Sequence, residues 1–88
     1  MLEKIDKYAF YECGHLYDIV FYPKLKFIGK RAFYKCELLT DISFKYKMEI
    51  DNEAFYKSGL KNIVLGNKIK KNMLGIRIFK HCDHIESI

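Results

Sequence analysis

The chain has 88 residues, of which half are hydrophobic and 31% are charged, and this composition excludes an intrinsically disordered segment. Seven Phe and seven Tyr, with no Trp, indicate a core in which large rings occupy repeated positions. The sequence contains nothing close to the roughly 18 to 20 consecutive apolar residues of a membrane-spanning helix, so we expect no membrane span. Residues 1–10 contain four charged side chains and therefore lack the apolar stretch of a secretory signal.

The formal net charge of +5 is concentrated in the second half of the chain. Residues 1–56 hold nine basic and nine acidic side chains and are neutral as a group. The next 24 residues hold seven basic side chains and no acidic one, a set called here the basic patch: Lys57, Lys61, Lys68, Lys70, Lys71, Arg77 and Lys80. Such a set is typical of a solvated surface, and it could also attract nucleic acid, an anionic membrane or an acidic protein.

A repeat with steps of 23, 22 and 24 residues runs along the chain. Its clearest marker is a pair that ends in Phe, at Ala9-Phe10, Ala32-Phe33, Ala54-Phe55 and Ile78-Phe79. Three residues after each Phe comes a small side chain, which is Cys13, Cys36, Ser58 or Cys82. The Ala-Phe-x-x-Cys portion predicts a tight turn or a single helical turn, with the Phe as the anchor of each coil.

The apolar residues after each turn predict one short strand per repeat. They follow the pattern Leu-x-x-Ile-x-Phe, whose last two apolar residues alternate as in a strand with one buried face. We therefore expect strands over about residues 17–22, 40–45, 61–66 and 86–88. Pro23 should end the first of them, because proline cannot donate to a ladder.

The segments that follow the strands are expected to return to the next turn. Leu2 with Ile5, and Leu25 with Ile28, should point inward on this return limb. Turns in this limb need unusual backbone dihedrals, which glycine adopts most readily. The glycines expected to supply them are Gly29, Gly59 and Gly66.

Residues 25–44 spell nearly the whole unit Leu-x-x-Ile-Gly-x-x-Ala-Phe-x-x-Cys-x-x-Leu-x-x-Ile-x-Phe, which resembles the BspA-like leucine-rich repeat family. One coil cannot bury its own apolar side, whereas stacked coils share a continuous core. We therefore predict a single leucine-rich repeat domain over residues 1–88. It should be a repeat solenoid of about four coils, mostly β with short turns or single helical turns, and an uncapped section of a longer solenoid.

The second half of the chain departs from the repeat. In the third repeat Ser58 replaces Cys, and residues 46–50 lack the Leu and Gly of the second repeat. In the fourth repeat Ile78 replaces Ala, and residues 68–75 are irregular. We therefore expect looser stacking of the coils in this half.

The three cysteines occupy one position of the repeat, which predicts a ladder of buried thiols. A disulfide between Cys13 and Cys36 stays open as an alternative, because stacked positions lie about 4.8 Å apart. The run from His81 to His84 contains Cys82 and looks like ligand chemistry, but no second Cys or His pair at zinc spacing accompanies it. We therefore predict no metal site and no cofactor.

Catalysis by a nucleophile needs a thiol or hydroxyl beside a base that a third group orients. Cys13-Gly14-His15 offers only adjacency in sequence. The glycines are spaced by turns and form no nucleotide-binding loop. We therefore predict that the protein is not an enzyme.

The remaining candidate for function is the exposed face of the predicted strands. Side chains that alternate with the buried Ile and Phe should point outward and form a set called here the strand-face row. Its members, with one neighbouring tyrosine, are Tyr17, Asp18, Val20, Tyr22, Asp41, Ser43, Lys45, Asn62 and Val64. Tyrosine is frequent at binding hot spots because it combines apolar area with a polar tip.

These features predict a module for protein-protein interaction or adhesion, with a protein partner whose identity the sequence does not give. The resemblance implies a location on the cell surface or outside the cell, because members of the family lie on the surfaces of bacteria and of some protozoan parasites. The alternative function is binding of nucleic acid or another anionic polymer through the basic patch of residues 57–80. Uncapped ends with exposed strand edges also favour end-to-end self-association.

Overall fold

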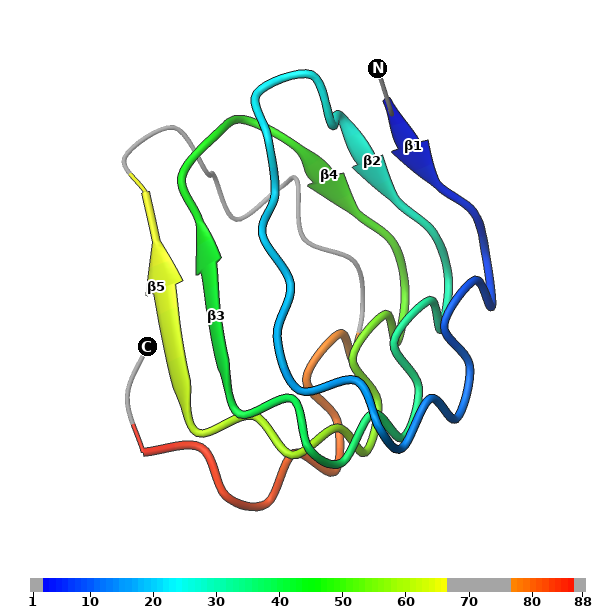
Figure 1. Cartoon of the computed structure of the whole chain (residues 1–88), viewed down its shortest axis with the longest axis vertical. Coiled ribbons are helices and arrows are strands. Elements are labelled where there is room, and N and C mark those ends of the chain that lie inside the picture. The colour runs from blue at the N-terminus through cyan, green and yellow to red at the C-terminus, as the bar shows by residue number, and fades with distance from the viewer. Residues whose placement is uncertain (1–2, 67–76, 87–88) are drawn as a thin grey trace.

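The computed structural model describes residues 3–66 and 77–86. It contains five short strands, which are β1 (Lys4–Ile5), β2 (Phe27–Ile28), β3 (Asp41–Phe44), β4 (Glu49–Ile50) and β5 (Asn62–Leu65). Strands β1, β2 and β4 form one parallel sheet, and β3 and β5 form a second. In Figure 1 the two sheets lie on opposite limbs of the same coils, and the turns close the coils at one end.

Each strand pairs with the strand one repeat along the chain. Ile5 lies beside Ile28, which in turn lies beside Ile50, and Ile42 lies beside Ile63. Equivalent residues of successive repeats are therefore neighbours, as a stack of coils requires. Within the described residues no segment is helical, so the tight turn, and not the single helical turn, is the correct alternative for Ala-Phe-x-x-Cys.

Aromatic stacking builds the core. The Phe33 and Phe55 rings are fully buried and stack at 4.9 Å with 2° between their planes, and Phe10 stacks on Phe33 at 5.2 Å. The first, second, third and fourth coils are named here by their anchors Phe10, Phe33, Phe55 and Phe79. Burial of these large rings at repeated sites removes apolar area from water in successive coils.

The predicted loosening of the second half begins later than expected. In the third coil Met48 and Ile50 are buried as fully as Leu25 and Ile28 in the second coil, so Met48 supplies the buried side chain that the missing Leu would give, while Asp51 stands at the position of Gly29. Departure from regular stacking begins at Phe79, which lies 6.0 Å from the Phe55 ring with 29° between the planes. Residues 68–75 lie outside the described residues.

Two of the four predicted strands are confirmed, because residues 40–45 and 61–66 contain β3 and β5. Residues 17–22 were predicted as a strand, which is wrong. This limb runs beside β3, with the Phe21 ring stacked on Phe44 at 5.5 Å, but it forms no ladder (Figure 1). A turn ends the limb, since the Leu25 N–H donates to the Tyr22 carbonyl across Pro23.

The fourth predicted strand and the return limbs have different outcomes. The Glu86 N–H donates to the Lys61 carbonyl, as a further strand would, but Glu86 is not in a strand and the last two residues lie outside the described residues. The return limbs of the first three coils contain β1, β2 and β4, which were not predicted as strands. Leu25 and Ile28 point inward as predicted, and Leu2 lies outside the described residues.

The turns adopt positive φ at residues other than glycine. In each coil the residue before the Ala and the residue before the Cys have φ between 53° and 61°. These residues are Tyr8, Glu12, Arg31, Lys35, Glu53, Lys57, Arg77 and His81, where Ile78 and Ser58 take the places of Ala and Cys. No glycine within the described residues has positive φ, so the expectation that glycine supplies these dihedrals is wrong.

The physical reason is the hydrogen bonding of the turns. The N–H groups of Tyr8, Phe10 and Glu12 donate to the carbonyls of Lys30, Ala32 and Tyr34 in the next coil, while the N–H groups between them bond three residues back in their own coil. Positive φ directs alternate amides to the neighbouring coil, which satisfies groups that would otherwise be buried without partners. The inter-coil bonds offset the strain of left-handed residues, which is about 1 kcal/mol each.

The glycines serve close packing of backbones. A Cβ at Gly29 would overlap the Lys7 amide and lie 2.7 Å from the Asp6 carbonyl carbon. A Cβ at Gly59 would overlap the Glu37 carbonyl oxygen. Glycine therefore allows successive coils to approach at these two positions.

Candidate functional site

The outer face of β3 and β5 carries the predicted strand-face row. Pairing places Asp41 opposite Asn62 and Ser43 opposite Val64, because equivalent residues of parallel strands lie side by side. Ile42 and Ile63, which alternate with them, are buried in the core. Val64 is 58% exposed, so an apolar side chain stands open on this face.

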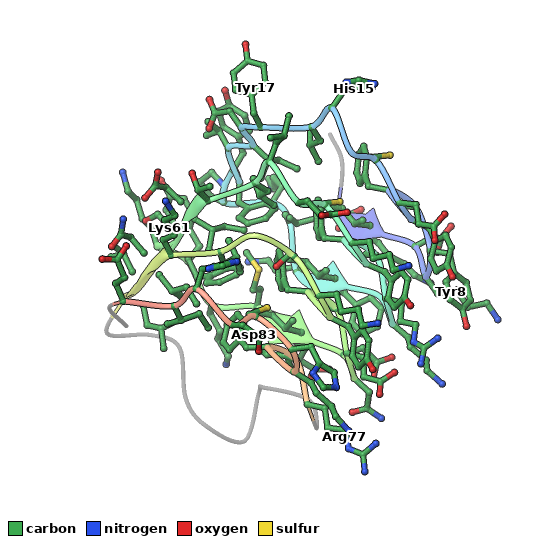
Figure 2. All side chains as sticks on the ribbon, turned by 90° about the horizontal axis from the view of Figure 1, so that it is seen from below. Tyr8, His15, Tyr17, Lys61, Arg77 and Asp83 are labelled. Atoms are coloured by element: carbon green, nitrogen blue, oxygen red, sulfur yellow. The ribbon has the colours of Figure 1, made fainter. Side chains whose placement is uncertain are left out.

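The limb of residues 17–22 extends this face beyond β3. Val20 and Tyr22 are 64% and 62% exposed, and the buried Phe21 lies between them. The limb and the two strands line one open groove of about 410 Å³. Eight of the nine predicted residues line it, and these are Asp18, Val20, Tyr22, Asp41, Ser43, Lys45, Asn62 and Val64. The predicted Tyr17 does not line the groove, and Figure 2 shows its ring pointing away from the body of the molecule.

The groove has an acidic end, an apolar centre and a basic end. Asp18 and Asp41 lie where the limb and β3 begin, and Lys45 lies just past the end of β3. Val20 and Val64 occupy the centre. Within the described residues neither aspartate takes part in an ion pair.

Two neighbours hold the Asp41 carboxylate in place. Asn62 Nδ2 donates to Asp41 Oδ1 at 2.8 Å, and Thr40 Oγ1 donates to Asp41 Oδ2 at 3.2 Å. Both donors are neutral, so neither forms an ion pair with the carboxylate, which has further lone pairs that can accept hydrogen bonds. The acidic end of the groove is therefore partly preorganised.

The three cysteines are free thiols, and two of them lie in the core. Cys36 and Cys82 are buried and Cys13 is half-buried, which confirms the predicted buried thiols at two of the three positions. Cys36 Sγ donates to the Phe10 carbonyl at 3.2 Å, and Cys82 Sγ donates to the Phe55 carbonyl at 3.0 Å. Burial raises the pKa of Cys36 to about 11 and also raises the pKa of Cys82, so both favour the thiol over the nucleophilic thiolate.

The candidate ligand run at residues 81–84 does not converge on a point. Within residues 3–66 and 77–86 no three His, Cys, Asp or Glu side chains are placed to hold a metal ion together. Cys82 faces inward toward Ser58, at 3.3 Å between Sγ and Oγ. His15 is exposed, and in Figure 2 it lies at the periphery of the molecule, away from Asp83.

A second surface was not predicted from the sequence: a ladder of rings across the turns. Tyr11 stacks on Tyr34 at 4.6 Å, Tyr34 stacks on Tyr56 at 5.3 Å, and Tyr56 meets His81 edge to face at 5.2 Å. The signal was present, because a Tyr follows the anchor Phe in the first three repeats. The rings cover one another's faces, so this ladder offers edges and hydroxyl groups to solvent.

An ion-pair cluster crosses this ladder. Arg31 Nε donates to Glu53 Oε1 at 2.7 Å, its guanidinium lies over the rings of Tyr34 and Tyr56, and Arg77 lies 3.9 Å from the other Glu53 oxygen. The hydrogen bond and charge of Arg31 lower the pKa of Glu53, and Glu53 in turn raises the pKa of Arg31. The cluster links the second, third and fourth coils.

Three of the four described members of the basic patch lie in the turns of the third and fourth coils, and the fourth, Lys61, lies apart from Arg77. Lys61 precedes β5, whereas Arg77 lies at the turn of the fourth coil, and Figure 2 shows the two well apart. Lys57 and Lys80 belong to the turns of successive coils, where the Lys57 N–H donates to the Lys80 carbonyl. The remaining three predicted members, Lys68, Lys70 and Lys71, lie outside the described residues.

Comparison with known proteins gives one family and one solved structure. The family described as BspA type leucine-rich repeat region (6 copies) matches residues 1–88. A leucine-rich repeat protein from Bacteroides ovatus, known from a crystal structure, superposes with a TM-score of 0.80 at 29% sequence identity. The match covers 91% of this chain and 21% of that protein, so the chain spans about a fifth of its relative. A comparison with curated proteins gave no match.

The described part of the chain was also searched for membrane spans. It contains no helix that is long and apolar enough to cross a membrane.

Proposed function

Since this chain belongs to the BspA-type leucine-rich repeat family, whose scaffold suggests a protein-interaction module, we propose that it binds a protein partner through the groove on β3, β5 and the limb of residues 17–22. The observation that carries the proposal is the concentration of exposed apolar side chains there. Val20, Tyr22 and Val64 are each more than half exposed and share one groove. A contiguous apolar patch with a charged rim is typical of an interaction site.

The groove fits a binding role better than a catalytic one. Its polar groups are two aspartates, a lysine, an asparagine, a serine and two tyrosine hydroxyls, and the buried thiols lie elsewhere in the core. Tyr22 and the valines supply rigid apolar area at low entropic cost, which suits an anchor for a partner side chain. We propose a binding module without catalysis.

The experiment is a quantitative pull-down from a mixture of extracellular proteins. The test variant carries Tyr22→Ala and Val64→Lys, and the matched control carries Leu38→Lys, because Leu38 is 53% exposed and lies outside the groove. We expect a partner that the unmodified protein captures to be lost by about tenfold or more with the test variant and to be retained by the control. Equal capture by all three proteins, each shown to be folded by circular dichroism, would rule out the groove as the site.

The wider setting is also part of the proposal. Repeats of this type are typically found in surface or secreted proteins, which supports a role in adhesion. We propose that residues 1–88 belong to one repeat domain.

End-to-end self-association is supported by an apolar hollow of about 160 Å³ in the first coil, lined by Phe10, Ile19, Phe21 and Leu25 among others. Light scattering that finds monomers alone at high protein concentration would contradict self-association.

A further inference from the structure

We propose that the groove selects an extended peptide segment with a basic side chain at one end, apolar side chains in its middle and an acidic side chain at the other end. The inference rests on the proposed function and names the chemistry of its partner. The basic side chain would lie at Asp18 and Asp41, the apolar one between Val20 and Val64, and the acidic one near Lys45.

The acidic end of the groove favours a basic side chain on the partner. Asp18 and Asp41 line the same end of the groove, and within the described residues no basic side chain pairs with either. Asn62 and Thr40 orient the Asp41 carboxylate without neutralising it. Two like charges at one end of an apolar groove raise the local negative potential and favour a cation there.

The net positive charge of the chain helps to distinguish binding at the acidic end of the groove from non-specific electrostatic attraction. A protein of net charge +5 attracts anions over long distances, so its overall field favours acidic partners. Preference for a basic side chain must then come from groups that line the groove, among which the two carboxylates carry the negative charge. Binding by overall charge and binding by the groove therefore predict opposite charge preferences, which makes the proposal easy to separate from non-specific attraction.

The dimensions of the face favour an extended segment. β3 has four residues, and the groove continues past it to Lys45, so about five residues at 3.3 Å each would span it. In an extended chain alternate side chains share one face. The expected pattern is therefore basic-x-apolar-x-acidic, in which every second side chain enters the groove and the others face solvent.

The test uses fluorescent peptides, blocked at both ends, and fluorescence polarisation with the whole chain. Three peptides share the middle Thr-Val-Thr and carry Arg and Glu, two Gln, or two Glu at their ends. We expect the Arg/Glu peptide to bind about fivefold or more tighter than the Gln/Gln peptide, with the Glu/Glu peptide weakest. This preference should shrink as salt rises, because the groove is exposed.

Two variants identify the groups responsible. Asp18→Asn with Asp41→Asn should bring the affinity of the Arg/Glu peptide close to that of the Gln/Gln peptide. Glu3→Gln with Glu49→Gln changes the net charge by the same amount on the opposite limb, at exposed residues outside the groove, and should leave the preference unchanged. A preference that persists in the aspartate variant, or is lost equally in both variants, overturns the proposal.

The remaining outcomes separate this inference from the proposed function. If the Glu/Glu peptide binds tightest, or if no peptide binds, the charge pattern proposed for the partner is wrong. The pull-down with Tyr22→Ala and Val64→Lys can still show a difference in that case, and the groove then remains the site for a partner of other chemistry. If the pull-down shows no difference either, the proposed function fails as well.

Discussion

Backbone-to-backbone approach between coils sets the strictest requirement at the scale of single residues. At Gly59 the N–H donates to the Cys36 carbonyl at 3.2 Å, and a Cβ would overlap the Glu37 carbonyl oxygen. Both partners in this contact are backbone atoms of the preceding coil, which cannot move without disturbing the turn. A side chain at this position therefore forces the coils apart.

We predict that Gly59→Ala destabilises the fold by about 2 kcal/mol or more, the range of overpacked cores and distorted backbones. The matched control is Gly14→Ala, because a Cβ at Gly14 meets no atom within 4 Å. Urea unfolding of the two variants should give a much lower midpoint for Gly59→Ala and a change within about 1 kcal/mol for Gly14→Ala. Similar midpoints for the two variants would contradict the close approach of the coils.

The positions of left-handed residues could not be predicted from residue type. Among the left-handed residues of the described part of the chain, only His81 is of a type enriched at positive φ, whereas the others are Tyr, Glu, Arg or Lys. At Tyr8, Glu12, Arg31 and Lys35 the N–H group donates to a carbonyl of the next coil, so the conformation depends on the assembled stack. The repeat predicted the turns correctly, but outside His81 no residue type enriched at positive φ marked the left-handed positions of the described residues.

At the scale of the elements, the ion-pair cluster in the turns links three successive coils. Arg31 belongs to the second coil, Glu53 to the third and Arg77 to the fourth, and the Glu53 side chain is only 13% exposed. Exposed ion pairs add little to stability, whereas a carboxylate held between two guanidinium groups and largely shielded from water depends on its partners more strongly. The cluster should therefore contribute to the stability of the turns.

We predict that this contribution disappears in acid. The pKa of Glu53 is lowered in the folded state, so its charge stabilises the fold above the unfolded pKa of about 4.3, and this stabilisation is lost as the pH falls through the lower folded pKa. The difference in unfolding free energy between the unmodified protein and Glu53→Gln should be full at pH 7 and should shrink below about pH 4.

The control for this prediction is Glu12→Gln. Glu12 also has positive φ but is about half exposed and lies 3.8 Å from Lys35, so its substitution should have a smaller effect at every pH. Urea titrations at several pH values measure both differences. A Glu53→Gln effect of equal size at pH 3 and pH 7 would show that charge is not its cause.

Strand prediction succeeded for β3 and β5, whose alternation is long enough to be recognised. β3 and β5 have four residues each and alternate buried with exposed side chains, whereas β1, β2 and β4 have two residues each and show no period. The limb of residues 17–22 has the same alternation as β3 but forms no ladder. The groove depends on all three segments, so its residues could be predicted from the pattern while its open shape could not.

Across the whole molecule the coils share one core, so each depends on its neighbours. The stack of Phe10, Phe33, Phe55 and Phe79 crosses every coil, with its closest contact between the second and third. In a fold of this kind stability is a sum of terms from each repeat and from each interface between repeats. Local unfolding of the stack should therefore begin at the outer coils and reach the second coil last.

The cysteine ladder can report this order, because it places thiols in the first, second and fourth coils. We predict that an aromatic disulfide reagent at pH 8 labels the half-buried Cys13 first, then Cys82, and Cys36 last, with Cys36 slower than Cys13 by a factor on the order of a hundred or more. Cys36 is fully buried, and its pKa of about 11 keeps it protonated at this pH, so it reacts only after the second coil opens.

Mass spectrometry of partly labelled protein measures the three rates, and labelling in urea gives the reference for each thiol in the unfolded chain. Cys13→Ala removes the fast phase and should leave the other two rates in the same order, because Cys13 is only half-buried and its loss opens a small cavity. Equal protection of Cys36 and Cys82 would mean that the stack opens as a single unit. Rapid labelling of Cys36 in native buffer would contradict the shared core, because a thiol with no exposed surface cannot react while the second coil is closed.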